Sequence, residues 1–149
     1  ATIEVETIVK FTDETLDLLD RCFAQDVAVA NGQPFLFKPR PARPPLFIGG
    51  QPPHAFRRAL AHRAGWIPMG LAPDALRGPA AALRAQAARA GLPAPEIAVM
   101  TGLPYDDPAR ARDVVAAYRD AGATRLIHAE RYADDRDLQR MLDGLTAIA

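Results

Sequence analysis

The chain has 149 residues, with 18 basic and 18 acidic side chains and no formal net charge. A neutral chain lacks the global field that attracts nucleic acid or an anionic membrane surface, so we expect neither partner. No apolar run approaches the roughly 20 residues that cross a bilayer, and residues 1–6 carry no basic or apolar signal segment. We therefore expect a single domain, residues 1–149, in the cytoplasm.

The residue types that support metal or nucleophilic chemistry are sparse. Cys22 is the only cysteine, which excludes an internal disulfide, and we interpret it as a packing residue on a helix. The three histidines, His54, His62 and His128, are scattered without a carboxylate pattern beside them, so we expect no metal site. No serine nucleophile motif, phosphate-binding P-loop or dinucleotide fingerprint is present. The sequence therefore assigns no catalytic residue.

The first 45 residues predict one helix and an extended segment. Residues 2–9 alternate in polarity, which favours a short strand. Thr12 resembles an N-cap, followed by two acidic residues that suit the start of a helix over about 13–24. Residues 27–45 contain five prolines and the turn signal Asn31-Gly32, so we predict extended, irregular chain there.

From residue 46 onward, a short apolar strand followed by a helix recurs four times. This alternation is typical of a parallel sheet in an α/β protein, with both faces of the sheet covered. Gly78-Pro79 predicts a defect in the second of these helices, and the aspartate pairs at 106–107 and 134–135 predict helix caps. The predicted strands are 46–48, 66–69, 97–100 and 126–128, and the predicted helices are 52–63, 73–90, 108–121 and 134–148.

Four strand-helix units make half of a (β/α)₈ barrel, which needs eight units and about 250 residues. We therefore predict an α/β fold, a parallel half-barrel over residues 46–149, preceded by the helix and extended segment of residues 1–45. A half-barrel alone would expose two strand edges and the apolar side chains of its inner wall. We expect it to associate, either with itself or with a missing partner.

The family resemblance rests on the segment RPPLFIGG at residues 43–50, followed by an Ala- and Arg-rich helix and then by Gly65-Trp66. This order resembles the Pro-Pro-strand-Gly-Gly and Gly-Trp pair of the bacterial luciferase-like monooxygenase superfamily. That superfamily includes FMN-dependent monooxygenases and enzymes that use the deazaflavin coenzyme. Segments 12–19 and 31–35 resemble the helix and insertion before the fifth barrel strand, and 121–126 resembles the approach to the eighth.

The resemblance covers about residues 11–148 and implies that the four units are the fifth to eighth of the barrel. In that superfamily the first four units carry a non-proline cis peptide behind the flavin ring and much of the substrate pocket. Only about ten residues precede the Thr12 helix here. The resemblance thus implies a naturally shortened relative, with Ala1 left by removal of an initiator Met, or a fragment, or one piece of a split protein. The expected partner is a second copy, in a homodimer, or a complementary N-terminal half-barrel chain.

The candidate cofactor site is the turn after the strand at residues 46–48. Glycines allow the backbone to approach a ligand, and the N–H groups at the start of the next helix attract phosphate. The carboxyl end of a parallel strand is also the active-site face of a β/α barrel. The resemblance implies that Gly49, Gly50 and Gln51 contact the phosphate of FMN or of the deazaflavin coenzyme. A tight turn without a ligand would use the same small residues.

Four further residues are candidates on the same face. His54 and Arg57 lie in the first turns of the helix, where they would add charge to a phosphate site or face solvent. Trp66 would cover a flavin ring or line a pocket, or else belong to the core. His128 ends the last strand and is placed to contact a ligand, but one histidine without a partner is not a catalytic dyad. The predicted cofactor-binding set is Gly49, Gly50, Gln51, His54 and Trp66.

Two functions, and a weaker third, are compatible with these features. The first is a flavin- or deazaflavin-dependent oxidoreductase or monooxygenase that acts on a small molecule, with the chemistry supplied by the cofactor. The second is a non-catalytic dimeric half-barrel that holds a flavin without turnover. The third is a relic without a ligand, which the unbroken periodicity of the four units disfavours.

Overall fold

The computed structural model of the chain describes residues 5–148. They divide into two compact units, one that ends at Leu46 and one that begins at Phe47. This boundary lies one residue from the predicted junction between the N-terminal segment and the four repeated units. The assignment of the whole chain to a single domain stays a prediction.

The first unit begins with helix α1, Val5–Ala24. The strand expected at residues 2–9 is therefore wrong over residues 5–9, and residues 2–4 lie outside the described part. The helix start predicted at Thr12 is also wrong, because no glycine or proline interrupts residues 5–24 and helix propagation adds a hydrogen bond at each step. Thr12 lies inside the helix, and one turn later the Thr15 hydroxyl donates to the Phe11 carbonyl oxygen at 2.7 Å.

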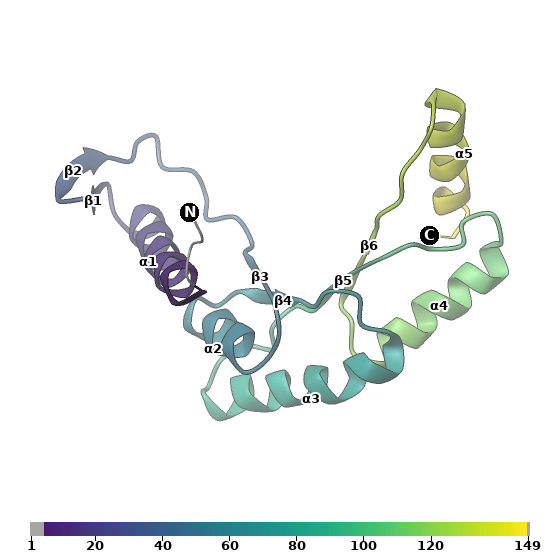
Figure 1. Cartoon of the computed structure of the whole chain (residues 1–149), viewed down its shortest axis with the longest axis horizontal. Coiled ribbons are helices and arrows are strands. Elements are labelled where there is room, and N and C mark those ends of the chain that lie inside the picture. Colours follow the sequence, from purple (N-terminus) through teal and green to yellow (C-terminus); the bar gives the residue numbers. More distant parts are fainter. Residues whose placement is uncertain (1–4, 149) are drawn as a thin grey trace. The chain divides into compact units, whose positions relative to one another are not determined.

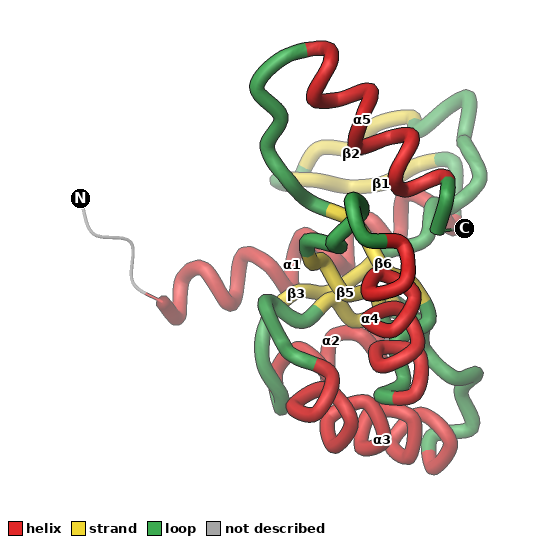
Figure 2. Tube along the Cα trace, turned by 90° about the vertical axis from the view of Figure 1, so that its right-hand side faces the viewer, coloured by secondary structure: helices red, strands yellow, loops and turns green. Residues whose placement is uncertain are grey.

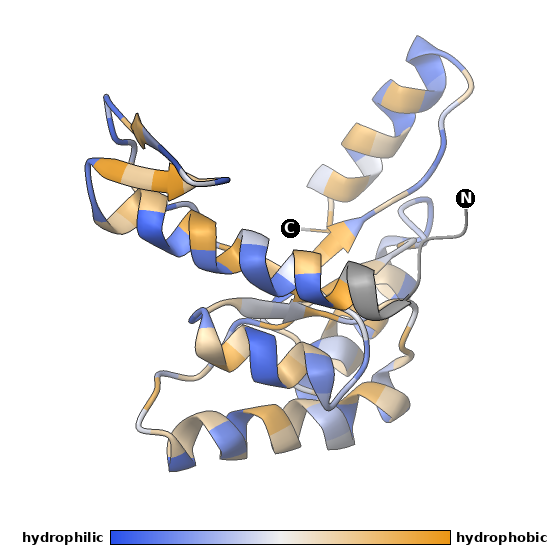
Figure 3. Cartoon of the chain, turned by 60° about the vertical axis from the view of Figure 1, so that its left-hand side comes forward, coloured by the Kyte–Doolittle hydropathy of each residue, from blue (hydrophilic) through white to orange (hydrophobic). Residues whose placement is uncertain are grey.

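Strands β1 (Val27–Ala30) and β2 (Gln33–Leu36) follow α1 and pair as an antiparallel hairpin. The predicted turn at Asn31-Gly32 is confirmed, and both residues have positive φ, 50° and 76°. Two left-handed residues in succession form the hairpin turn for which Asn-Gly is the preferred pair. Strand β1 consists of apolar residues and is coloured as hydrophobic in Figure 3. Cys22 of α1 is 5% exposed, which confirms that it packs in the interior of this unit.

The second unit contains four short parallel strands, and the predicted direction of every one is confirmed. Strand β3 pairs with β4, and β5 pairs with β6. A parallel bridge between Trp66 and Ile97 connects the two pairs, and the Trp66 N–H donates to the Glu96 carbonyl oxygen at 2.9 Å. Over residues 5–148 the strands do not form a closed barrel. The strands are β3 (Phe47–Gly49), β4 (Gly65–Ile67), β5 (Ala98–Thr101) and β6 (Arg125–His128).

The predicted helices of this unit are confirmed, with bounds shifted by a few residues. Figures 1 and 2 show α2 and α3 on the same side of the strands. Asp107 caps α4 and Asp134 caps α5, each by accepting a backbone N–H three residues later, as predicted. The helices are α2 (His54–Ala61), α3 (Pro73–Arg89), α4 (Pro108–Asp120) and α5 (Asp135–Thr146).

The predicted defect at Gly78-Pro79 lies inside α3, and the helix continues through both residues. The face of α3 that packs against the rest of the unit has residues at helical spacing that are at most 1% exposed: Leu76, Ala80, Leu83 and Ala87. Their burial is worth several kcal/mol by area, which offsets the roughly 3 kcal/mol that an interior proline costs. Tertiary packing therefore overrides the local propensity here.

The two faces of the strands differ in what covers them. Successive residues of a strand point to opposite faces, and Trp66 points to the face covered by α2, because its ring packs on Phe56. The opposite face, called the open face below, carries Phe47, Ile67, Met100 and Ile127 by register. Of these, Met100 is 44% exposed and the other three are partly exposed.

Candidate functional site

The bend after β3 lies at the carboxyl end of a parallel strand, as predicted. Gly49, Gly50, Gln51 and His54 are all exposed there. Gly50 has φ of 103°, which an L residue with a side chain rarely adopts, so the bend requires glycine at this position. At Gly49 an added Cβ would only touch Ile67 at 4.0 Å, so space and conformation permit a side chain. Gly50 is therefore the residue that sets the shape of the bend.

Trp66 supports the bend from inside the protein. Its side chain is fully buried, and its indole N–H donates to the Gly50 carbonyl oxygen at 2.9 Å. The indole ring meets the Phe56 ring edge to face at 5.0 Å between centroids. Trp66 thus belongs to the core, one of the two roles that the sequence left open. Its link to the exposed surface is the Gly50 carbonyl that it holds.

The donors available at the bend follow from its sequence. Pro52 and Pro53 have no N–H, and the Ala55 N–H already donates to the Gln51 carbonyl oxygen at 3.1 Å. The N–H groups of Gly50, Gln51 and His54 are therefore the ones chemically suited to contact an anion beside the bend. The His54 imidazole stands at the first residue of α2, where the helix dipole favours negative charge.

The charged residues of the segment that contains the bend all have the same sign. Residues 47–73, which include β3, α2 and β4, contain no aspartate or glutamate. The same segment contains three arginines and two histidines, among them Arg57, Arg58 and His54. A carboxylate beside the bend would compete with a phosphate for its donors, and no such group exists in this segment. The local charge therefore favours an anionic ligand.

His128 lies at the same edge of the strands, at the end of β6. Its Nδ1 accepts the Leu103 N–H at 3.0 Å, and its Nε2 lies 3.4 Å from a Glu130 carboxylate oxygen. The His128 side chain is 9% exposed, and Nε2 lacks a partner with good hydrogen-bond geometry. Tyr105 meets the imidazole edge to face at 5.6 Å. His128 was a candidate from the sequence, but its neighbours were not.

The neighbours of His128 come from two loops that the sequence does not show to be adjacent. Leu103 and Tyr105 follow β5, whereas Glu130 follows β6. The sequence feature that could have placed these loops together is the alternation of strands and helices. It predicts parallel strands, and the loops that follow two paired parallel strands lie at the same edge of the sheet. Tyr105 is held in turn by Arg140 of α5, and that hydrogen bond, together with the Asp137 carboxylate, raises the pKa of Arg140 above its ordinary value.

Neither a metal-binding cluster nor a membrane-spanning helix is found within residues 5–148. No group of three or more His, Cys, Asp or Glu residues in this range is placed to hold a metal ion. None of the helices described has the length and apolar character that crossing a membrane requires.

Short parallel strands with helices on one side, and a glycine bend at their carboxyl edge, define an α/β protein with a candidate site at that edge. The sequence profile of the family described as luciferase-like monooxygenase matches residues 3–148. The chain belongs to the luciferase-like monooxygenase family, which confirms the resemblance and extends it nearly to the first residue. A comparison with curated proteins found no match.

Proposed function

We propose that this chain binds the phosphate of FMN or of a deazaflavin coenzyme at the Gly49-Gly50 bend, as part of a cytoplasmic luciferase-like oxidoreductase or monooxygenase. The observation that carries the proposal is the Gly50 bend, with its positive φ and its carbonyl held by Trp66. A bend fixed in this way keeps its N–H groups in one arrangement before a ligand arrives. Preorganised donors bind more tightly because less conformational entropy is lost on binding.

The residues at the bend fit a phosphate group in three respects. A Cβ at Gly50 would impose strain where the backbone must come close to the ligand. The N–H groups of Gly50, Gln51 and His54 lie at the start of α2, which is the usual anion site of a helix. Residues 47–73 contribute only positive charge. Gly49 and Gln51 complete the proposed set, with His54 as the side chain that contacts the phosphate.

When bound, the flavin supplies the redox chemistry, and the protein supplies binding, orientation and exclusion of water. The role of this chain's residues is to fix the phosphate end of the cofactor. Trp66 acts one step away, by holding the Gly50 carbonyl, and its indole ring packs on Phe56 in the core. A small-molecule substrate would meet the cofactor at the same carboxyl edge, where β/α barrels place their reacting groups.

We also propose that the four strands are half of a barrel wall, and the open face supports this proposal. Phe47, Ile67, Met100 and Ile127 form an apolar surface on the face away from α2. Such a face is stable in water only when another layer covers it. We infer that a second copy of this chain, or a complementary half-barrel chain, covers it and completes the pocket beside the bend.

An alternative function is a flavin-binding half-barrel without turnover. The observation that favours it is the absence of any acidic residue from segment 47–73, so that His54 has no carboxylate partner within that segment. An acid-base pair would then have to come from another part of the assembly. A bound cofactor with no oxygen consumption above the rate of the free reduced flavin would support this alternative.

The test is a titration of the purified chain with FMN, with the deazaflavin coenzyme and with riboflavin, which lacks the phosphate. We expect micromolar or tighter binding of one phosphorylated cofactor, and about tenfold weaker binding of its counterpart without phosphate, because charge-assisted hydrogen bonds are lost. Absence of binding by both cofactors would refute the proposal. Equal affinity for FMN and riboflavin would refute the phosphate site.

A matched pair of variants separates an effect on ligand binding at the bend from a general loss of stability caused by backbone strain. Gly50→Ala and Gly91→Ala each place a side chain at a positive φ, 103° and 67°, and neither meets a backbone clash. Both should lose about 1–2 kcal/mol of stability. Only Gly50→Ala should weaken FMN binding, by about tenfold, because Gly91 follows α3 and is not part of the bend.

A further inference from the structure

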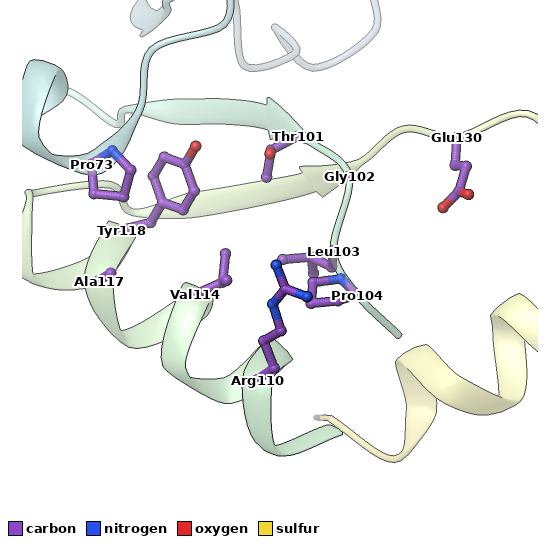
Figure 4. A pocket seen from close by; sticks show the side chains of 10 residues that line it. All are labelled: Pro73, Thr101, Gly102, Leu103, Pro104, Arg110, Val114, Ala117, Tyr118 and Glu130. Atoms are coloured by element: carbon purple, nitrogen blue, oxygen red, sulfur yellow. The ribbon is translucent and has the colours of Figure 1, made fainter. Parts of the chain in front are cut away.

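A cavity lies between the strand pair β5–β6 and helix α4, apart from the glycine bend (Figure 4). Its volume is about 570 Å³, within the usual range for sites that bind small organic molecules. Leu103, Val114 and Tyr118 form part of an apolar wall, and Arg110 and Glu130 contribute the charges. The Tyr118 hydroxyl donates to the Leu71 carbonyl oxygen at 3.1 Å, so this wall is fixed.

Arg110 is the cation of this cavity. It lies in the first turn of α4, where its backbone N–H is bound by the Asp107 cap at 3.1 Å. Its side chain is exposed, and within residues 5–148 the structure shows no ion pair or side-chain hydrogen bond for the guanidinium. A guanidinium that faces a cavity without a carboxylate partner has its paired donors available for a ligand carboxylate.

Glu130 differs because the imidazole of His128 already lies beside its carboxylate. Its carboxylate lies 3.4 Å from His128 Nε2, and its side chain is 45% exposed. Because His128 Nδ1 accepts the Leu103 N–H, the proton of the neutral imidazole is on Nε2, on the side of Glu130. His128 therefore positions the Leu103 wall and lies next to the Glu130 carboxylate. Figure 4 shows Arg110 rising from α4 and Glu130 projecting from the segment after β6.

We propose that this cavity binds a small monocarboxylate with an apolar body. The ligand carboxylate pairs with Arg110, and the apolar body lies along Leu103, Val114 and Tyr118. Glu130 selects against a second carboxylate, because two like charges in one partly desolvated cavity repel each other. This site goes beyond the proposed cofactor site, since none of the residues lining it belongs to the bend.

The test uses three probes of similar shape: phenylacetate, its neutral analogue phenylacetamide, and the dicarboxylate 1,4-phenylenediacetate. Binding to the full chain is followed by amide shifts in ¹⁵N NMR spectra. We expect phenylacetate to shift the amides of Thr101, Leu103 and Arg110 while those of Gly49 and Gly50 stay unchanged. Its affinity should exceed that of the other two probes by about tenfold. Equal affinity for phenylacetate and phenylacetamide would overturn the proposal.

Variants on one helix supply the controls. Arg110→Gln should lower the phenylacetate affinity about tenfold, to that of phenylacetamide, whereas Arg119→Gln in the last turn of α4 should change nothing. Glu130→Gln should raise the affinity for the dicarboxylate. An equal loss in both arginine variants, or shifts confined to the glycine bend, would overturn the assignment. Because FMN binding at the bend is measured separately, failure of either site is recognised independently.

Discussion

Replacing Trp66 with phenylalanine removes the bond that holds the bend and keeps an aromatic ring in the core. The lost indole N–H leaves the Gly50 carbonyl without its donor, which costs about 1 kcal/mol. The smaller ring buries roughly 40 Å² less apolar surface, worth about another 1 kcal/mol at about 25 cal/mol per Å². We therefore expect the free energy of unfolding to fall by about 2 kcal/mol.

The same substitution should weaken FMN binding by about fivefold to tenfold, because the Gly50 carbonyl no longer fixes the donors of the bend. Urea unfolding followed by circular dichroism gives the stability, and flavin fluorescence gives the affinity. Phe56→Leu is the matched control, since it weakens the same ring cluster without touching the Gly50 bond. If FMN affinity falls equally in both variants, or in neither, the coupling between Trp66 and the bend is wrong.

Three further predictions concern stability and are checked by urea unfolding. Gly65→Ala should destabilise the chain by about 2–3 kcal/mol, because the new Cβ would lie 2.5 Å from a Phe47 ring carbon and 2.9 Å from the Glu96 carbonyl oxygen. Pro79→Ala should stabilise it by about 1–2 kcal/mol, since α3 regains a hydrogen bond while the unfolded chain gains freedom. Asp134→Ala should cost about 1 kcal/mol through loss of the α5 cap, and Asp134→Ser should restore most of it.

Each of these has a clear contrary result. Gly49→Ala, whose Cβ meets only Ile67 at 4.0 Å, should be nearly neutral, and a loss as large as that of Gly65→Ala would contradict the steric reasoning. A lower midpoint for Pro79→Ala would mean that the proline ring itself packs favourably. An unchanged midpoint for Asp134→Ala would mean that α5 does not need its cap.

The four strand-helix units could be predicted from the sequence because their signals are local. Each strand is an apolar run closed by glycine, proline or a polar residue, and Pro108 marks the first helical position of α4. The failures have a different cause. The start of α1, and with it the strand expected at residues 2–9, depends on helix propagation, which a cap signal at Thr12 does not report.

The candidate site also combines features that the sequence predicts with contacts that it does not predict. The glycines of the bend are visible in the sequence because their chemistry lies in adjacent residues. The bond between Trp66 and Gly50 joins positions 16 residues apart, and that between His128 and Leu103 joins positions 25 apart. Both depend on which loops the parallel strands bring to one edge, so residue type alone could nominate Trp66 and His128 but not their partners.

The indole that holds the bend is also the only tryptophan of the chain. Its intrinsic fluorescence therefore comes from a single emitter, shielded from water and hydrogen-bonded to the carbonyl of Gly50. A ligand that settles on the bend will change the emission of that one ring, and so will a substitution that loosens it. The protein thus carries its own fluorescent reporter beside the proposed phosphate site, and ligand binding there can be followed without an attached label.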